Sequence, residues 1–99
     1  MRISAKGRYA LCATVFLAQS YRSGEYITVL SISERLGISK IYLEQVFSLL
    51  KRGGIVSSVK GAQGGYQISR RPEEIKVYDI LSAVETSLFE DNDETVTES

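Results

Sequence analysis

Residues 28–54, TVLSISERLGISKIYLEQVFSLLKRGG, hold two short amphipathic segments separated by a glycine. The apolar residues of the first segment recur at helical spacing, at Val29, Ile32 and Leu36. Thr28 can cap this segment, Gly37 breaks it, and Ser39 can cap the longer helix that follows. A short helix, a glycine-containing turn and a serine-capped longer helix are typical of a helix-turn-helix, although an ordinary helical hairpin has the same outline.

The longer helix has one apolar side and one mostly polar side. Its apolar side is formed by Leu43, Val46, Phe47 and Leu50. The opposite side offers Lys40, Ile41, Glu44, Gln45 and Ser48. The pair Gly53-Gly54 is expected to end the helix. We therefore expect the apolar side to face the core and the opposite side to be available to a partner.

Two short strands are expected directly after this helix, at residues 55–59 and 66–70, joined by the loop KGAQGG at 60–65. A nucleotide-binding loop would need G-x-x-x-x-G-K-[ST] or G-x-G-x-x-G leading from a strand into a helix, and this loop has strands on both sides. Its glycines instead suit the thin tip of a β-hairpin. A hairpin after a helix-turn-helix is a wing. The predicted fold class is therefore α+β: a winged helix-turn-helix, mostly helical with one two-stranded β-hairpin wing.

Two further helices are expected, one at each end of the domain. Ser4 can cap the first, whose run YALCATVFLA at 9–18 is apolar nearly all round. This pattern predicts a helix to about Tyr21 that is buried from two sides, with an inert, buried Cys12. The run is shorter than the ~20 residues that span a bilayer, so no membrane segment is expected. The last helix begins near residue 77, with apolar positions Val77, Ile80, Leu81, Val84 and Leu88.

The net charge of zero conceals two oppositely charged parts. Residues 1–71 contain eleven Lys and Arg against three Asp and Glu, whereas residues 72–99 contain one Lys against nine acids. The excess of Lys and Arg in residues 1–71 suggests a polyanionic partner. The simpler alternative is that these charges are ordinary solvated surface groups. We expect one DNA-binding domain at 1–88 and, at 89–99, an acidic tail that is disordered or begins a missing C-terminal segment.

A winged helix-turn-helix can place its third helix in the DNA major groove while the hairpin reaches the minor groove or the phosphates. Glu44 can accept from cytosine, Gln45 can pair with adenine, and Lys40 can read guanine or hold a phosphate. The candidate contacts are Ser39, Lys40, Ile41, Tyr42, Glu44 and Gln45 on the helix, Lys60, Gly61 and Gln63 on the wing, and Arg2, Lys6 and Arg8 to phosphate. Each can also be an ordinary surface side chain, and Tyr42 can equally belong to the core.

Three stretches in order, MRISAKGRYAL, ISERLGIS followed by YLEQ, and KGAQGGYQIS, resemble the Rrf-two family of bacterial winged-helix regulators over about residues 1–88. The resemblance implies a transcription factor, usually a repressor, that binds a pseudo-palindromic operator as a homodimer. By position, Glu44 and Gln45 match base-reading residues of the family, and Lys60 matches a basic residue that enters the minor groove. Ile41 stands where some members have serine, which would exchange a hydrogen bond for contact with a thymine methyl group.

The C-terminal part departs from the family pattern. Cluster-binding members carry three cysteines after the fourth helix and then a long dimerisation helix, whereas 87–99, SLFEDNDETVTES, contain no Cys or His. No iron–sulfur cluster with the usual ligands, and no other cofactor, is therefore expected in these 99 residues. Either the chain is a piece of a longer regulator or a homodimer must use the second apolar side of the first helix.

The sequence thus predicts a sequence-specific regulator whose partner is double-stranded DNA. The alternative is a winged-helix module that binds protein without binding DNA, and the fold alone does not distinguish the two. An enzyme is not expected, because the chain has no histidine and its single cysteine lies in an apolar run. One cysteine without a disulfide framework fits a reducing, cytoplasmic setting. The operator sequence and any effector molecule or protein partner are not specified by these residues.

Overall fold

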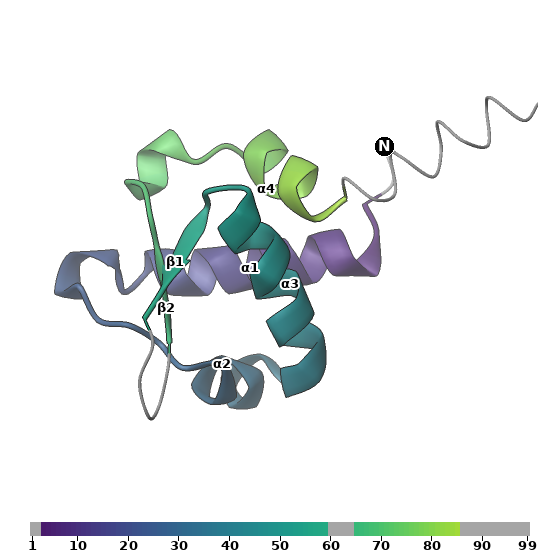
Figure 1. The fold of residues 1–99 in the computed structure, drawn as a ribbon, viewed down its shortest axis with the longest axis horizontal. Helices are drawn as coiled ribbons and strands as arrows, with labels where there is room; N and C mark the ends of the chain where they lie inside the picture. Colours follow the sequence, from purple (N-terminus) through teal and green to yellow (C-terminus); the bar gives the residue numbers. More distant parts are fainter. Residues whose placement is uncertain (1–2, 60–64, 86–99) are drawn as a thin grey trace, which may run out of the picture.

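The computed structural model describes residues 3–59 and 65–85. These residues form four α-helices and a two-stranded antiparallel hairpin (Figure 1). The helices are α1 Ala5–Ala18, α2 Val29–Leu36, α3 Lys40–Arg52 and α4 Val77–Val84. The strands are β1 Val56–Ser58 and β2 Tyr66–Ile68, and two 3₁₀ turns are η1 Tyr21–Ser23 and η2 Pro72–Glu74. The predicted α+β class, a helix-turn-helix followed by a hairpin, is confirmed.

The helix boundaries follow from capping side chains. Ser4, Thr28 and Ser39 each accept a hydrogen bond from a backbone N–H in the first turn of α1, α2 and α3, respectively. These three caps were predicted. α1 ends at Ala18 rather than near Tyr21, because the chain turns there into η1, which closes with a bond from the Gly24 N–H to the Tyr21 carbonyl.

α3 is the centre of the core. It packs against α1, α2, α4 and β1, and Tyr66 of β2 also reaches it through the ring of Phe47 (Figure 1). Its inner side is fully buried and consists of the four predicted residues Leu43, Val46, Phe47 and Leu50. The surrounding elements contribute Ala10, Ala13 and Leu17 from α1, Ile32 from α2, Val56 and Ile68 from the strands, and Ile80 and Val84 from α4. Burial of this one side fixes the opposite side of α3 in solvent.

A third segment of backbone pairs with the hairpin, and the sequence did not predict it. β1 and β2 pair antiparallel, with Val56 opposite Ile68 and Ser58 opposite Tyr66. On the other edge of β2, Ile27 and Tyr66 exchange two backbone N–H···O bonds, both of 2.8 Å. This single bridge attaches the hairpin to the segment that leads into α2. One bridging residue has no sequence periodicity, so the contact could not be predicted from a hydrophobic pattern.

The sequence predicted burial of α1 from two sides, by the core on one side and by a second element or a second subunit on the other, and the structure of the single chain shows the first of these. Only one side of the helix faces the core, and the other side leaves Cys12 exposed and Val15 56% exposed. The small residues Ala10 and Ala13 let the neighbouring elements come close on the buried side, and nothing in the described residues covers the opposite side. A hollow of about 420 Å³ lies there, lined by Leu11, Cys12, Val15, Phe16, Gln19 and Leu36. Within the single chain, Cys12 is exposed, so the prediction of a thiol buried in the domain core is wrong.

A buried carboxylate connects the two ends of the domain. Glu85, at the end of α4, is 6% exposed and accepts a 3.2 Å hydrogen bond from the Ser4 N–H and another from the Ser4 hydroxyl. A Cβ atom at Gly7 would stand 2.8 Å from the same carboxylate oxygen, so a larger residue there would force the Glu85 side chain to move. Sequence reasoning missed this contact, because 81 positions separate the two partners.

α4 begins at Val77 as predicted, and Ile80, Leu81 and Val84 are buried, but Val77 itself is 58% exposed. Val77 is the first residue of the helix and lies beyond the surface that α1 and α3 cover. Leu88, the predicted tail at 89–99 and the domain boundary lie outside the described residues. Within the part of the chain that is described, no helix has both the length and the apolar character to cross a membrane.

Gly37 provides a test of the turn between α2 and α3. Its φ of 67° lies in the left-handed region, and no atom lies within 4 Å of the place where a Cβ would stand. Gly37→Ala should therefore lower the free energy of unfolding by about 1–2 kcal/mol through backbone strain alone. Gly37→Asn should cost less, because asparagine tolerates this conformation. Urea denaturation measures both; equal losses for Ala and Asn, or no loss for Ala, would contradict this reading.

Candidate nucleic-acid interface

The side of α3 that faces solvent, here called the outer face, carries most of the predicted helix contacts. It consists of Lys40, Ile41, Glu44, Gln45 and Ser48, all of them exposed. Ile41 is 69% exposed, because it lies opposite the buried Leu43 and Val46 on the helix. A shallow depression of about 460 Å³ is lined by Ile41, Glu44, Gln45, Ser48 and Leu49. One continuous surface therefore offers carboxylate, amide, hydroxyl and aliphatic groups.

The turn before α3 is held by Ser33, which sequence reasoning did not single out. The Ser33 carbonyl accepts from the N–H groups of Gly37, at 2.9 Å, and Ile38, at 3.2 Å. The Ser33 hydroxyl donates to the Ile38 carbonyl at 2.5 Å. Three hydrogen bonds from one residue fix the angle at which α3 leaves α2. The half-buried Ile38 of this turn packs against the core.

Ser39 and Lys40 lie at the exposed start of α3. The Ser39 hydroxyl accepts from the Tyr42 N–H at 3.3 Å. The remaining unpaired N–H groups of the first turn give this end of the helix a partial positive charge. The exposed Lys40 side chain adds a full one. An anion such as a phosphate would be stabilised at this position.

Tyr42 points toward α1 rather than along the outer face. Its ring meets Tyr9 edge to face, with the centroids 5.5 Å apart and an angle of 87° between the planes. Burial, together with the neighbouring Tyr9, raises the pKa of Tyr42 above its ordinary value. Tyr42 is half-buried against the core cluster, which is one of the two roles that the sequence left open. Its phenol stays protonated at neutral pH and keeps its O–H donor.

The hairpin is attached to α3 through an aromatic stack. The Tyr66 ring lies on the ring of Phe47, with centroids 4.5 Å apart and planes inclined by 14°. Burial and the charge of Glu44 both raise the pKa of Tyr66. Gln67 adds a second anchor, since its side-chain amide donates to the Gly24 carbonyl at 2.7 Å. The base of the wing is thus fixed against the helix that carries the outer face.

The basic residues predicted to contact phosphates are only partly described. Lys6 is half-exposed and Arg8 is exposed, on the first turns of α1. Tyr9, next to Arg8, reaches Tyr42, so this end of α1 lies near the start of α3. Arg2 on the N-terminus, and Lys60, Gly61 and Gln63 on the wing, lie outside the described residues.

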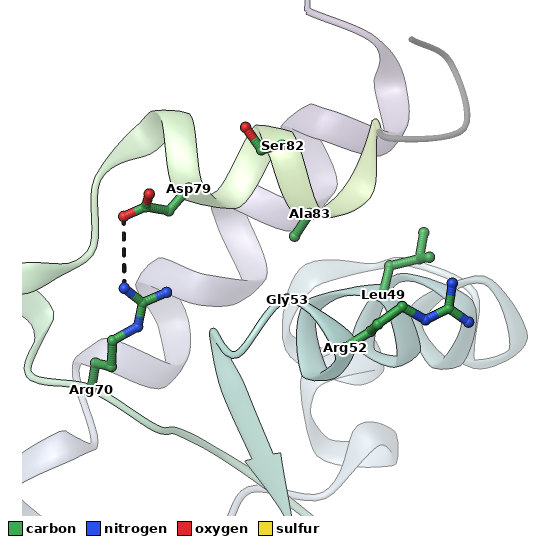
Figure 2. A pocket seen from close by; sticks show the side chains of 7 residues that line it. All are labelled: Leu49, Arg52, Gly53, Arg70, Asp79, Ser82 and Ala83. Carbon is green, nitrogen blue, oxygen red and sulfur yellow. Dashed lines mark ion pairs between the residues drawn. The ribbon is translucent and has the colours of Figure 1, made fainter. Parts of the chain in front are cut away.

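A second hollow, of about 390 Å³, lies between the end of α3 and α4 (Figure 2). It is lined by Leu49, Arg52, Gly53, Arg70, Asp79, Ser82 and Ala83. Figure 2 shows the Arg70 guanidinium turned toward Asp79, with an Nη1–Oδ2 distance of 3.9 Å, whereas Arg52 points the other way. Because the two guanidinium groups do not converge, the hollow offers no common position for an anion. We interpret it as the packing seam between the end of α3, the segment that follows β2, and α4.

Comparison with known proteins gives one consistent result. The Rrf2 family model, described as iron-dependent transcriptional regulator, matches residues 3–98. The HTH-type transcriptional regulator IscR of Cereibacter sphaeroides is 45% identical over 89 residues, which are 89% of this chain and 57% of the relative. The IscR of Escherichia coli O1:K1 / APEC is 44% identical over 88 residues, 89% of this chain and 54% of the relative. The chain thus spans about half the length of these curated relatives.

Solved structures agree with this result. T. potens IscR matches with a TM-score of 0.75 and 37% sequence identity, over 99% of this chain and 78% of that one. CymR, the global cysteine regulator of B. subtilis, matches with a TM-score of 0.80 and 36% identity, over 86% of this chain and 65% of that one. These relatives are regulators, which agrees with the prediction that the chain is not an enzyme.

An iron–sulfur cluster needs several cysteine or histidine ligands close together. Within residues 3–59 and 65–85, no three His, Cys, Asp or Glu side chains are grouped so that they could hold a metal ion. The 99 residues include one cysteine, Cys12 on α1, and no histidine. These residues therefore do not fit a cluster held by three or four thiolates.

The raised pKa of Tyr66 predicts a loss of stability in alkali. The unfolded chain releases the phenol proton near the ordinary value of 10.0, and the folded chain only above it. The stabilisation is therefore complete below that value and is lost as the pH rises through the folded-state pKa. Tyr66→Phe should make the decline in the free energy of unfolding from about pH 9 to about pH 11 shallower than in the unchanged chain. Urea denaturation at several pH values measures this, and parallel declines would contradict it.

Proposed function

The chain belongs to the Rrf2 family of transcriptional regulators, and we propose that it is a DNA-binding regulator that selects its site by base sequence. The observation that carries the proposal is the outer face of α3: an exposed carboxylate, amide and aliphatic group on a helix held rigidly by a helix-turn-helix. Such a helix fits the major groove, where each base pair presents a distinct set of donors, acceptors and methyl groups.

The outer face has the chemistry for direct readout. The Gln45 amide can both donate to and accept from adenine, and the Glu44 carboxylate can accept from the amino group of cytosine. Near phosphates a carboxylate is repelled, so an exposed Glu44 on this helix favours a base edge as its partner. The side chain of Ile41 can contact a thymine methyl group. Ser39 and Lys40, at the positive end of α3, suit the phosphate beside the groove.

The wing and α1 would supply the contacts that do not depend on sequence. We assign Lys60, Gly61 and Gln63 to the minor groove and the adjoining backbone, with Arg2, Lys6 and Arg8 on phosphates. The excess of Lys and Arg over residues 1–71 supports this assignment. Tyr42, half-buried beside Tyr9, has a protonated hydroxyl that can donate to a phosphate oxygen.

The remaining properties are proposed for the protein as a whole. It acts in the cytoplasm as a repressor and binds a pseudo-palindromic operator as a homodimer. The uncovered apolar side of α1, with its 420 Å³ hollow, supports a second copy as the occupant. Residues 1–88 form the DNA-binding domain, and the acidic stretch 89–99 is a tail or the start of a further segment. These 99 residues alone hold no iron–sulfur cluster.

Lys60→Ala tests the role of the wing. Removing one lysine that displaces a counterion from DNA should weaken binding and lower the slope of log affinity against log salt by about one unit. Fluorescence anisotropy with a labelled duplex at several salt concentrations gives the slope. Lys76→Ala, an exposed lysine just before α4, serves as the matched control and should leave the slope unchanged. A Lys60→Ala slope equal to that of the unchanged protein would remove Lys60 from the interface.

Glu44→Ala tests base reading. The loss of one base contact should relax the preference at a single base pair by about 1–3 kcal/mol and leave the other positions as they were. Selection from a random duplex pool, followed by titration of the single-base variants, measures this. Glu73→Ala, which removes an exposed carboxylate in η2, is the control. An equal loss of affinity for every duplex would refute the assignment of Glu44 to a base.

A protein-binding module on the same scaffold would give a different pattern. It would be indifferent to duplex DNA at all salt concentrations, and Lys60→Ala and Glu44→Ala would change neither slope nor preference. Such a result would replace the proposed function.

A further inference from the structure

The first turn of α1 is held by a carboxylate from the other end of the domain. The Ser4 N–H donates to the Glu85 carboxylate at 3.2 Å, and the Ser4 hydroxyl donates to it as well. The same hydroxyl accepts from the Gly7 N–H at 3.0 Å, and the Ser4 carbonyl accepts from the Arg8 N–H at 3.0 Å. Because a hydroxyl has a single proton, its donation to Glu85 leaves the oxygen lone pairs free for Gly7. Glu85 therefore fixes the orientation of the residue that caps α1.

The Glu85 carboxylate is buried without a cation beside it. It is 6% exposed, and no Lys or Arg forms an ion pair with it within residues 3–59 and 65–85. Its charge is stabilised instead by the two hydrogen bonds from Ser4 and by the positive end of the α1 dipole. Moving the carboxylate away from these partners would leave a buried charge uncompensated, which is costly. The contact therefore holds the start of α1 in one position.

The end of α1 that Glu85 holds is also the end that carries basic side chains. Lys6 is half-exposed and Arg8 is exposed, and both follow closely after the cap. The next residue, Tyr9, meets Tyr42 of α3 edge to face. The positions of these two cations relative to α3 therefore depend on the position of the first turn of α1.

We propose that Glu85 is a positioning residue for DNA binding. Through Ser4 it holds the first turn of α1 where Lys6 and Arg8 contact phosphates beside the groove that α3 enters. This inference rests on the proposed function, in which these two residues bind phosphate. It adds that the affinity for DNA depends on a buried carboxylate at the end of α4 that does not itself contact DNA.

The sign of the effect separates positioning from charge. Glu85→Ala removes a negative charge, so electrostatics alone would strengthen binding to a polyanion. The loss of the positioning contact weakens binding instead, because the first turn of α1 is no longer fixed. Glu85→Gln removes the same charge but keeps a side-chain oxygen that can accept from both donors of Ser4. Positioning therefore predicts that the alanine variant binds more weakly and that the glutamine variant does not.

Fluorescence anisotropy measures this with a labelled duplex, selected by the unchanged protein, at several salt concentrations. Glu85→Ala should lower the affinity and reduce the slope of log affinity against log salt by about one to two units, since Lys6 and Arg8 each displace about one counterion. Glu85→Gln should keep the slope of the unchanged protein. In a protein that already carries Lys6→Ala and Arg8→Ala, Glu85→Ala should cause no further change in slope.

Two controls separate positioning from a loss of folded protein. Glu73→Ala, which removes an exposed carboxylate from η2, matches the change in charge and should leave the slope unchanged. A purely structural role of Glu85 would lower the melting temperature and the fraction of active protein without changing the slope. Thermal unfolding shows whether each variant is folded at the assay temperature. If Glu85→Ala is not folded, Ser4→Ala tests the same contact from its other side and should reduce the slope in the same direction.

Four results would overturn the inference. If Glu85→Ala binds as tightly as the unchanged protein, with the same slope, Glu85 does not position α1, and the proposed function stands. If Glu85→Gln loses as much slope as Glu85→Ala, the hydrogen bonds to Ser4 are not the cause. If Lys6→Ala with Arg8→Ala leaves the slope unchanged, these residues do not bind phosphate, and base reading by α3 is unaffected. If the unchanged protein binds no duplex, the proposed function fails, and this inference fails with it.

Discussion

The burial of Phe47 and its neighbours on the inner side of α3 is the constraint on which the surface depends. Four fully buried side chains fix the rotation of the helix about its own axis. Once this rotation is fixed, Glu44, Gln45 and Ile41 can only face solvent. Phe47 has a second role, because Tyr66 stacks on it from the hairpin. The same residue thus orients α3 and sets the position of β2.

Around this centre, short polar contacts set the positions that hydrophobic packing leaves open. Ser33 fixes the turn into α3 through three hydrogen bonds, and the Ile27–Tyr66 bridge fixes the outer edge of the hairpin. Glu85 joins the end of α4 to the cap of α1 through Ser4. Hydrophobic burial is not directional, whereas hydrogen bonds have defined geometry. The angles between the elements therefore depend on a few serines, a glutamate and a strand bridge.

The sequence predicted what local chemistry determines. The caps at Ser4, Thr28 and Ser39, the stop at Gly37, the inner side of α3 and the antiparallel hairpin were all confirmed, because each depends on residues close in sequence. The Ile27 bridge and the Ser4–Glu85 contact were missed, because distant partners leave no periodic signal. Cys12 was wrongly assigned to the interior, since an all-round apolar helix does not say whether its second side is covered within the same chain. The outer face of α3 could be predicted in full, whereas the stacking of Tyr66 on Phe47 needed the structure.

The most direct test of sequence-selective DNA binding is fluorescence anisotropy with the duplex that lies upstream of the protein's own gene. A shuffled duplex of the same composition is the control, and both are titrated across a series of salt concentrations. The account predicts tighter binding to the upstream duplex, with a steep fall in affinity as salt increases, since phosphate contacts provide the affinity and the outer face of α3 provides the selection. Equal and weak binding to both duplexes at every salt concentration would contradict it.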